Sequence, residues 1–392
     1  MKKKILYVAS VYRHIRDFHL PYLQELSRQG CLVDLACRMP PAAPRGAAGS
    51  GSTPDRAGSG DVSFINDFIN LPFEKKMTSV SNFRAAAMLR RRIVREQYDL
   101  IILHTSLAAF FTRLALKGLK SRPKVINMVH GYLFDDRTPA RRRMLLERAE
   151  RLTRAETDLV MTMNQWDYEL ARRLRLGRKV VNIPGVGLDS RRFGPPGPAD
   201  SMPEGSVSGL RSRLGIPEGA FVVLFAAEFS GRKNQETLIR GMRLLPDNVF
   251  LLLPGDGARL EDCRELAAET APGRVIIPGY IPEIRDWYAE ADLAASSSRY
   301  EGLPVNIMEA MYFGLPTAAT DIKGHVDLLG GRPAAGLFWK CGDEAGFADC
   351  VRRLMDSPVL RQELGREAVK RIPHYQLETA GPLIMKHYLS ML

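Results

Sequence analysis

Two glutamates, Glu301 and Glu309, lie eight residues apart where a buried strand, a turn and a helix are predicted to follow one another. The strand ends in the small residues 296–298, Gly302 permits the turn, and Pro304 suits a first helical turn because its missing N–H would be unpaired there anyway. The free amides and positive dipole end of such a helix form an anion site. The candidate donors are the amides of Leu303, Val305 and Asn306. Since carboxylates also bind sugar hydroxyls, this stretch favours a ligand with phosphate and sugar groups, although each glutamate alone is more simply a loop charge or a solvated helix residue.

Histidines stand at the ends of predicted strands in the first half of the chain. Arg13, His14 and His19 flank a turn after the first strand, a position at which doubly wound domains bind phosphates. We expect backbone contacts to a diphosphate near Arg13 and His14. His104 ends another strand, where a functional role and a structural hydrogen bond are equally compatible with the sequence. His130 ends a third strand and precedes a glycine, so its ring can face a cleft between domains.

Short apolar strands and helix-period segments alternate around these residues. Continuous Val, Ile and Leu runs separated by helices indicate a parallel sheet that is covered on both faces. In the first half the predicted strands are Ile5–Ser10, Leu32–Cys37, Leu100–His104, Val125–Val129 and Leu159–Asn164, with a helix at His19–Gln29. Residues 40–60, rich in Pro, Ala, Gly and Ser, are predicted to form a mobile loop.

A second α/β pattern follows a Pro-, Gly- and Ser-rich linker at Arg191–Gly209. Its predicted strands are Phe221–Ala227, Val249–Pro254, Val275–Pro278 and Leu293–Ser296, and its helices are Gln235–Leu245, Arg259–Thr270, Ile284–Ala291 and Val305–Phe313. Doubly wound sheets bind ligands at the carboxyl ends of their strands. The sequence therefore predicts domains at 1–190 and 191–372 that face each other across a cleft, and a final segment, 373–392, whose helix crosses back to the first domain.

Composition excludes several classes of protein. The chain has 392 residues, of which 45% are hydrophobic and 26% charged, as expected for two globular domains. No apolar stretch approaches the ~18 residues that a membrane-spanning helix needs. The apolar run after Lys2–Lys4 is interrupted at Arg13 and no cleavage site follows, which favours a cytoplasmic first strand over a signal peptide. The five cysteines form no C-x-x-C pair, so neither a zinc site nor a disulfide framework is favoured.

The positive charge is concentrated in the first half of the chain. Residues 1–190 hold 33 Lys and Arg against 18 Asp and Glu, which gives +15, whereas the remainder carries −3. The segments Arg84–Arg95 and Arg137–Arg154 are predicted to be helices with cationic faces and apolar stripes. Such helices can lie on an anionic membrane surface, although helices packed on the domain with solvated basic faces are the alternative. No nucleic-acid-binding motif is present.

The spacing of Glu301 and Glu309, followed by a Gly-Leu-Pro helix stop, resembles the family-four retaining glycosyltransferases of GT-B fold, in particular those that build capsule or exopolysaccharide repeat units. Further stretches agree with this family in order and spacing. They are Val8–Tyr22, Tyr98–Thr105, residues 130–132, Asp158–Tyr168, Ile183–Asp189 and Glu228–Leu238. The resemblance spans roughly residues 4–330. It implies two Rossmann-like domains, the first binding an acceptor and the second a nucleotide-sugar.

The resemblance also implies a role for each matching residue. Glu301 would bind donor-sugar hydroxyls, Arg232 and Lys233 would bind the diphosphate, and His130 would lie beside the donor sugar. We expect acceptor contacts from His19 and His104. The other donor-binding positions implied are Glu228, Gly231, Gly302, Leu303, Pro304, Val305, Asn306, Arg13 and His14, with Glu309 at the ribose and Gly279 and Tyr280 along the nucleobase. Many relatives carry Arg where this chain has Glu228, which weakens the expected phosphate role of Arg232.

Together these patterns predict a retaining, metal-independent glycosyltransferase without a cofactor. It would transfer a sugar from a nucleotide-sugar donor, most simply a UDP-sugar, to a lipid-diphosphate-linked saccharide. It would act in the cytoplasm at the inner face of the plasma membrane and bind no nucleic acid. The alternatives are a nucleotide-sugar epimerase of the same fold, which needs no acceptor, a non-catalytic nucleotide-sugar-binding protein, and a nucleic-acid binder.

Overall fold

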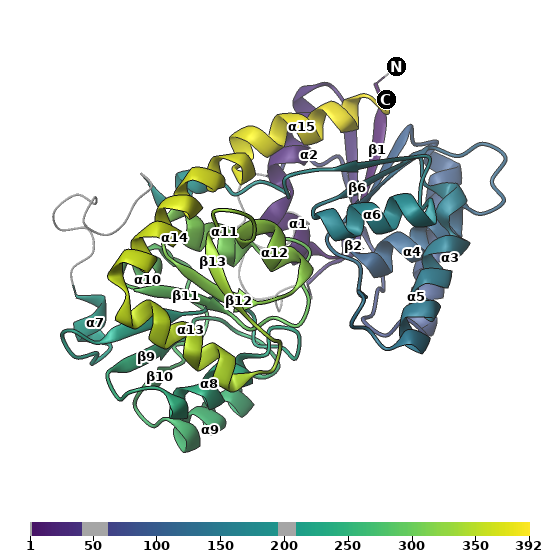
Figure 1. The fold of residues 1–392 in the computed structure, drawn as a ribbon. Coiled ribbons are helices and arrows are strands. Elements are labelled where there is room, and N and C mark those ends of the chain that lie inside the picture. Colours follow the sequence, from purple (N-terminus) through teal and green to yellow (C-terminus); the bar gives the residue numbers. More distant parts are fainter. Residues whose placement is uncertain (1, 41–61, 195–208) are drawn as a thin grey trace, which may run out of the picture. The chain divides into compact units, whose positions relative to one another are not determined.

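The computed structural model describes residues 2–40, 62–194 and 209–392, and the chain folds into two compact units. Unit 1 comprises Met1–Val186 and Gly381–Leu392, and unit 2 comprises Gly187–Ala380 (Figure 1). The division falls at Gly187 rather than at residue 191, because Leu188 already bonds to unit 2, its amide donating to the Tyr375 carbonyl over 2.9 Å. The predicted loop at 40–60, apart from Pro40, and most of the predicted linker lie outside the described residues.

Unit 1 is built on a seven-stranded parallel sheet with the strand order β3-β2-β1-β4-β5-β6-β7. Its strands are β1 Lys4–Val11, β2 Leu32–Arg38, β3 Asp67–Asn70, β4 Leu100–His104, β5 Lys124–Val129, β6 Leu159–Thr162 and β7 Lys179–Asn182. All five residues of β4 are buried. A strand buried on both faces can be apolar throughout, which is why this strand could be predicted from sequence.

Helices cover both faces of the unit 1 sheet. They are α1 Tyr12–Phe18, α2 Leu20–Arg28, α3 Val80–Glu96, α4 Ser106–Leu116, α5 Ala140–Leu152, α6 Gln165–Leu174 and the end of α15, Leu377–Leu389. Leu6 and Val8 of β1 join the core formed with α3 and α4. Tyr7, which points to the opposite face, lies with its hydroxyl 3.3 Å from that of Tyr388 in α15. The C-terminal helix therefore completes the core of unit 1.

Unit 2 contains a six-stranded parallel sheet with the order β10-β9-β8-β11-β12-β13. Its strands are β8 Phe221–Leu224, β9 Val249–Leu252, β10 Val275–Ile276, β11 Leu293–Ser296, β12 Thr317–Thr320 and β13 Gly336–Trp339. Its α-helices are α7 Leu210–Arg213, α8 Gln235–Gly241, α9 Leu260–Thr270, α10 Arg285–Ala289, α11 Val305–Tyr312, α12 Lys323–Leu329, α13 Glu344–Asp356 and α14 Pro358–Arg371. Alternate residues of β8 enter two separate hydrophobic cores, so both faces of this sheet are covered too.

Each sheet has a point at which the strand order reverses, between β1 and β4 in unit 1 and between β8 and β11 in unit 2. Loops that follow neighbouring strands diverge there and leave room for a ligand at the carboxyl ends. In unit 1 this edge carries the segments after β1, β4 and β5, and in unit 2 the segments after β8 and β11. The predicted site residues cluster at these two edges. Among the described residues no helix is both long and apolar enough to span a bilayer.

Candidate active site

Two loops of unit 2, one after β8 and one after β11, are joined by hydrogen bonds. The Ser297 hydroxyl donates to the carbonyl of Lys233 over 2.9 Å, and the Arg299 amide donates to the carbonyl of Arg232 over 2.8 Å. Asn234, in the left-handed region at φ 56°, accepts a 2.9 Å hydrogen bond from the Arg299 guanidinium. Because β8 and β11 are paired in parallel, both loops leave the same edge of the sheet. Their contacts fix the basic pair relative to the glutamate loop.

Glu301 forms ion pairs with both cations of the β8 loop. Its Oε1 lies 2.7 Å from Nζ of Lys233, and its Oε2 accepts a hydrogen bond from Nη1 of Arg232 over 2.5 Å. The side chains of Glu301 and Lys233 are only 9% and 11% exposed. Burial opposes ionisation of this carboxyl, but Lys233 and Arg232 lower the pKa of Glu301 to about 2. A negative charge is thus held between two positive ones, and Lys233 is not the exposed helix-start residue that sequence alone would allow.

Glu309 occupies a second polar site, about one helical turn after the start of α11. It accepts a 2.8 Å hydrogen bond from the Tyr288 hydroxyl at Oε2 and forms an ion pair with Arg192 at Oε1. Burial raises the pKa of Glu309, although Arg192 opposes this shift. Tyr288 is fixed in turn by stacking on Phe313, with ring centroids 5.4 Å apart. Glu309 is therefore a buried, oriented acceptor and not a solvated helix residue.

A buried histidine of α12, His325, supports the glutamate loop. Its Nδ1 lies 2.7 Å from the carbonyl of Thr320, so Nδ1 carries the proton and Nε2 accepts from the Ser296 hydroxyl at 3.2 Å. Burial lowers the pKa of His325 to about 4, although the Glu301 carboxylate opposes this. The preceding Gly324 lies so close to the loop that an added Cβ would be 2.6 Å from the carbonyl oxygen of Gly302. A larger residue there would displace the turn that carries Glu301.

The other donor-site positions predicted in unit 2 lie along the same edge. Pro304 is in extended conformation directly before α11, which begins at Val305 as predicted. Gly279 has φ +90° after β10, and the Tyr280 side chain is 59% exposed. Glu228 and Gly231 lie in the β8 loop and are exposed, and the Glu228 carbonyl accepts from the Gln235 side chain over 2.9 Å. The Asn306 carbonyl accepts a hydrogen bond from Tyr288, while Gly302 and Leu303 complete the turn.

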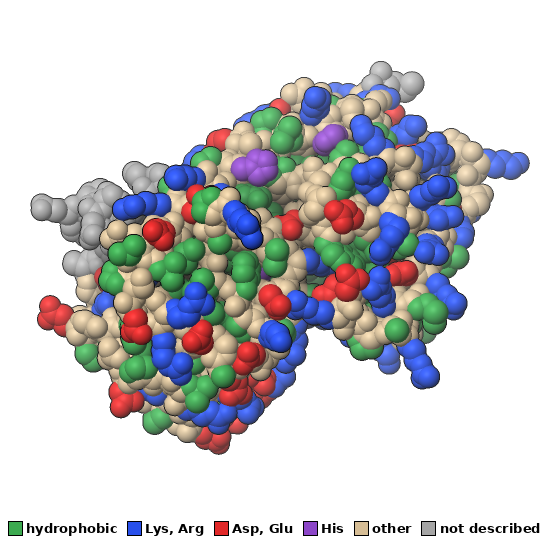
Figure 2. Space-filling view, viewed as in Figure 1, with side chains coloured by type: hydrophobic (Ala, Val, Ile, Leu, Met, Phe, Trp, Pro, Cys, Tyr) green, Lys and Arg blue, Asp and Glu red, His purple; other side chains and the backbone are tan. Residues whose placement is uncertain are grey.

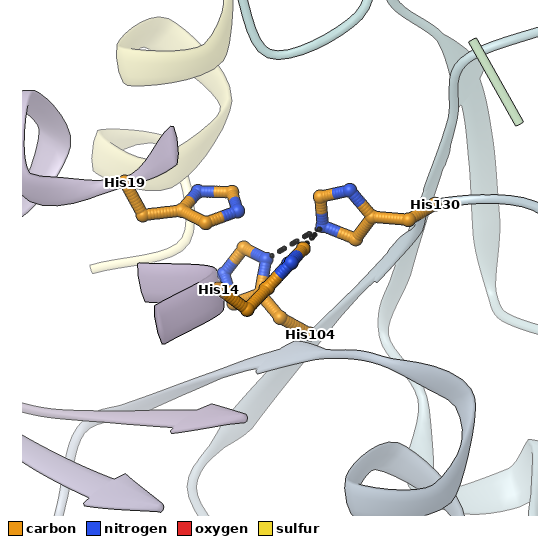
Figure 3. A group of neighbouring side chains, drawn as sticks. All are labelled: His14, His19, His104 and His130. Carbon is orange, nitrogen blue, oxygen red and sulfur yellow. Dashed lines mark hydrogen bonds between the residues drawn. The ribbon is translucent and has the colours of Figure 1, made fainter. Parts of the chain in front are cut away.

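The four predicted histidines of unit 1 meet at the carboxyl edge of its sheet, and Figure 3 shows their rings directed at one another. We call His14, His19, His104 and His130 the histidine cluster. One nitrogen from each ring lies within 4.8 Å of the corresponding nitrogens of the other three. Nε2 of His130 is 3.0 Å from Nδ1 of His104 and 3.4 Å from Nε2 of His14.

The histidine cluster is held as neutral rings. Burial lowers the pKa of His14 to about 4. Burial also lowers the pKa values of His19, His104 and His130, and neighbouring imidazoles add to the effect. On the inner side, Tyr7 stacks on His104 at 4.4 Å, and its hydroxyl lies 3.1 Å from Nδ1 of His19. These contacts orient two of the four rings.

Buried neutral histidines predict a loss of stability in mild acid. Below pH ~6.5 the unfolded chain binds protons at these residues, whereas folded His14 and His325, with pKa values of about 4, do not. The free energy of unfolding should therefore fall between pH 6.5 and 4, by on the order of 3 kcal/mol for each of these two residues. Urea unfolding at several pH values measures this. A flat curve would contradict buried neutral rings.

The segment that carries Arg13 differs from its sequence interpretation. The segment after β1 is not a turn but the helix α1, Tyr12–Phe18, and His19 connects it to α2. The residues after β1 satisfy helical spacing, with Tyr12 and Ile15 buried. Arg13 is on the exposed side, with an ion pair to Asp17 at 3.3 Å, while His14 joins the cluster. The structure brings the histidines together but does not bring the Arg13 side chain to them.

Comparisons with known proteins identify the family. Residues 22–186 match the family model described as Glycosyltransferase Family 4, and residues 208–371 match the model described as Glycosyl transferases group 1. Together the two matches account for most of both units. The chain belongs to the family-four glycosyltransferases.

Two relatives are similar over most of its length. EpsD of Bacillus subtilis (strain 168), named as a glycosyltransferase, is 29% identical over 94% of this chain and 92% of its own.

The second relative and the solved structures agree with this assignment. The UDP-Gal:alpha-D-GlcNAc-diphosphoundecaprenol alpha-1,3-galactosyltransferase of Escherichia coli is 22% identical over 73% of this transferase and 74% of its own chain. Sucrose-phosphate synthase from Thermosynechococcus elongatus has a TM-score of 0.75 at 19% identity, covering 100% of this chain and 99% of that one. Anabaena Alr3699/HepE in complex with UDP has a TM-score of 0.71 at 18% identity, covering 100% of both chains. The transferase therefore has the GT-B fold, as predicted.

Three residues at the unit 2 site of the transferase were missed by sequence reasoning: Arg192, Tyr288 and His325. Arg192 stands in what the sequence suggested was linker, and nothing local indicates that it reaches Glu309 across 117 residues. Tyr288 lies in a helix whose pattern indicates only burial. His325 lies in α12, five residues after the end of β12 at Thr320, and this position shortly after a strand end is the one signal that could have identified it.

Proposed function

We propose that this glycosyltransferase moves a sugar from a UDP-sugar to a lipid-diphosphate-linked saccharide, with retention of the anomeric configuration. The observation that carries the proposal is the buried arrangement of Glu301 with Arg232 and Lys233 beside the start of α11. It combines an acceptor for sugar hydroxyls with two fixed cations and free helix amides for a diphosphate. Relatives add support, because the Escherichia coli enzyme is named for a UDP-galactose donor and a diphosphoundecaprenol acceptor, and Anabaena Alr3699/HepE binds UDP.

In the proposed reaction the diphosphate leaves the anomeric carbon with its bonding electron pair. The acceptor hydroxyl attacks that carbon from the same face and gives its proton to the departing diphosphate oxygen. Lys233 and Arg232 stabilise the roughly two negative charges that develop, a role that preorganised cations fulfil well in a site screened from water. The mechanism uses no protein nucleophile, and these cations take the place that a metal ion would occupy at the diphosphate, so no cofactor is required.

The remaining donor contacts follow from the geometry of unit 2. Glu309 is proposed to accept hydrogen bonds from the ribose, since Tyr288 and Arg192 already fix its carboxylate. Gly279, which has no side chain, and the exposed Tyr280 would lie along the nucleobase. The exposed Glu228 and Gly231 border the diphosphate region. Arg232 keeps its proposed phosphate role because Glu301 orients its guanidinium.

In unit 1 the histidine cluster is proposed to contact both substrates. His14 and His130 are partly exposed, whereas His19 and His104 are fully buried. We therefore assign direct contacts to the first two, with His130 binding a hydroxyl of the donor sugar through Nδ1, on the ring edge away from the cluster. His19 and His104, expected to bind the acceptor, would lie behind them. The backbone near Arg13 and His14 remains the proposed contact for a diphosphate.

A membrane-facing role is proposed for two helices of unit 1, on which Lys and Arg side chains are prominent in Figure 2. The outer face of α3 carries exposed apolar residues between arginines. They are Val80, Phe83, Met88 and Val94, with Arg84, Arg91 and Arg95.

The second helix, α5, carries a similar exposed stripe, formed by Arg141, Leu145, Arg148 and Leu152. A buried ion pair between Arg113 of α4 and Glu150 of α5, at 2.8 Å, fixes that helix with its stripe outward. Such surfaces bind anionic lipid at about 1 kcal/mol per basic residue, which would place the enzyme at the inner face of the plasma membrane, in the cytoplasm.

Leu145→Gln is expected to weaken binding to vesicles containing anionic lipid by about tenfold, because a leucine side chain transferred from water to an apolar medium gains roughly 1.5–3 kcal/mol. Val359 of α14 is the matched control, since it is 66% exposed against 67% for Leu145 but lies in unit 2. Sedimentation with vesicles at low salt measures both variants. Equal binding of Leu145→Gln and Val359→Gln, or no retention of wild type, would exclude this surface as the membrane contact.

The function is tested by release of nucleoside diphosphate from a panel of UDP- and GDP-sugars, with and without a membrane lipid extract. We expect release from one UDP-sugar that depends on the lipid and is lost in Glu301→Ala. Tight UDP binding with no release from any donor would instead support the non-catalytic binding protein. Conversion of the donor without lipid would support an epimerase.

A further inference from the structure

The nitrogens of the histidine cluster are arranged as metal ligands are. Zinc–nitrogen bonds of about 2.0–2.1 Å place the nitrogens of a tetrahedral site about 3.3–3.4 Å apart. Two nitrogen–nitrogen separations in the cluster are 3.0 and 3.4 Å, and no pair of ligand nitrogens exceeds 4.8 Å. Side-chain rotations that bring the two most distant ligand nitrogens roughly 1.5 Å closer together would therefore give the nitrogen–nitrogen distances of a tetrahedral zinc site. The rings come from the carboxyl end of β4 and from the segments after β1 and β5, and Figure 3 shows them directed at one another.

Within the described residues, the ring nitrogens of the cluster do not all have a hydrogen-bond partner. Nε2 of His19 is fully buried and has no hydrogen-bond partner there. Nε2 of His130 faces nitrogens of two other rings, and a single nitrogen cannot donate to both. A buried polar atom without a hydrogen-bond partner destabilises the fold. A cation at the centre would use the converging lone pairs.

The surroundings of the cluster provide the outer contacts that metal-binding histidines require. The Tyr7 hydroxyl lies 3.1 Å from Nδ1 of His19 and 3.3 Å from the Tyr388 hydroxyl. If Tyr7 donates to Tyr388, it can accept the Nδ1 proton of His19, which leaves the Nε2 lone pair directed at the cluster.

We propose that the histidine cluster binds a divalent transition-metal ion, with zinc as the ion that best suits four imidazoles. This site was not predicted from the sequence, because positions 14, 19, 104 and 130 form no short ligand motif. The ion binds through Nε2 of His130 and so leaves the Nδ1 edge of that ring for the sugar contact proposed above. This site goes beyond the proposed transferase function and does not supply the diphosphate charge in unit 2.

Zinc binding is tested on the full-length protein without a polyhistidine tag, after treatment with a chelator and with no nucleotide-sugar present. We expect one zinc ion per chain by calorimetric titration. Cobalt(II) should give the intense visible absorption of tetrahedral nitrogen coordination. No binding by wild type, or a weak octahedral cobalt spectrum, would overturn the proposal and leave the transferase function untouched, because neither readout involves sugar transfer.

Variants assign the ion to the cluster. His14→Ala and His130→Ala remove partly exposed rings, which limits the damage to the fold, and circular dichroism verifies that each variant is folded. Each should weaken zinc binding by more than the ~10–100-fold that loss of an outer contact costs. Tyr7→Phe keeps the ring that stacks on His104 but removes the hydroxyl near His19, and should weaken binding by about 10–100-fold. His374→Ala, which removes an exposed histidine outside the cluster, should bind as wild type does. Equal affinity in all variants would place the ion elsewhere and overturn the proposal.

Discussion

Replacing Glu301 with glutamine is expected to lower kcat/KM for sugar transfer by about 10²–10³-fold, the range seen when one preorganised polar group is removed from an active site. The carboxylate is proposed to bind donor hydroxyls and also orients Arg232 and Lys233 through contacts of 2.5 and 2.7 Å. Glutamine keeps the shape and one acceptor oxygen but removes the charge. Both proposed roles are therefore weakened by one substitution.

Steady-state release of nucleoside diphosphate in the presence of acceptor lipid measures the effect. Glu236 offers a matched control, because it also pairs with an arginine, Arg259, at 2.5 Å but is 31% exposed. Glu236→Gln should change stability by no more than about 1 kcal/mol, as for surface ion pairs generally, and should keep wild-type activity. Wild-type turnover in folded Glu301→Gln would show that the carboxylate is not part of the active site.

Lys233→Met is expected to lower transfer by a similar factor and, in addition, to destabilise the fold. Removing one partner of a buried ion pair costs about 3–5 kcal/mol, and here Arg232 compensates part of this because it remains bonded to Glu301. Because both side chains are buried, we also expect the two substitutions to be coupled in their effect on stability. A Glu301→Gln, Lys233→Met double variant should recover much of the lost stability, because no uncompensated buried carboxylate remains.

Urea unfolding of the two single variants and the double variant gives the coupling energy between these residues, and turnover is measured on the same preparations. The expected result is recovery of stability without recovery of activity, which separates the structural role of the pair from its role toward the diphosphate. Additive losses of stability would contradict the ion pair. Recovery of turnover in the double variant would contradict a role for either residue in the reaction.

The architecture could be predicted because strands of parallel sheets are buried on both faces and read as continuous apolar runs. β11 was predicted at its observed bounds, Leu293–Ser296, and α11 to within one residue. The helix α1 was missed because seven residues with two buried positions give too short a pattern. Strands such as β3, with four partly buried or exposed residues, carry no apolar run at all.

The candidate site was predictable where a residue ends a strand or lies in the segment after one. His104 is the last residue of β4 and His130 directly follows β5, while Lys233 and Glu301 lie in the loops after β8 and β11, and strands of one parallel sheet end at the same edge. Arg192 and Tyr288 come from segments whose approach to Glu309 depends on tertiary packing, so no local pattern reveals them. The mutual approach of the four histidines depends on the order of β1, β4 and β5 in the sheet. The sequence placed these rings at strand ends without indicating that they meet.

The most direct test of the proposed reaction is the product itself. Purified enzyme is incubated with the UDP-sugar selected by the release assay and with a polyprenyl-diphosphate-linked saccharide, and the lipid fraction is analysed by mass spectrometry and nuclear magnetic resonance. We predict an acceptor extended by one sugar residue, joined with the same anomeric configuration as in the donor, and no extension with Glu301→Gln. An inverted linkage, or diphosphate release with free sugar and an unchanged acceptor, would contradict the proposed retaining transfer to lipid.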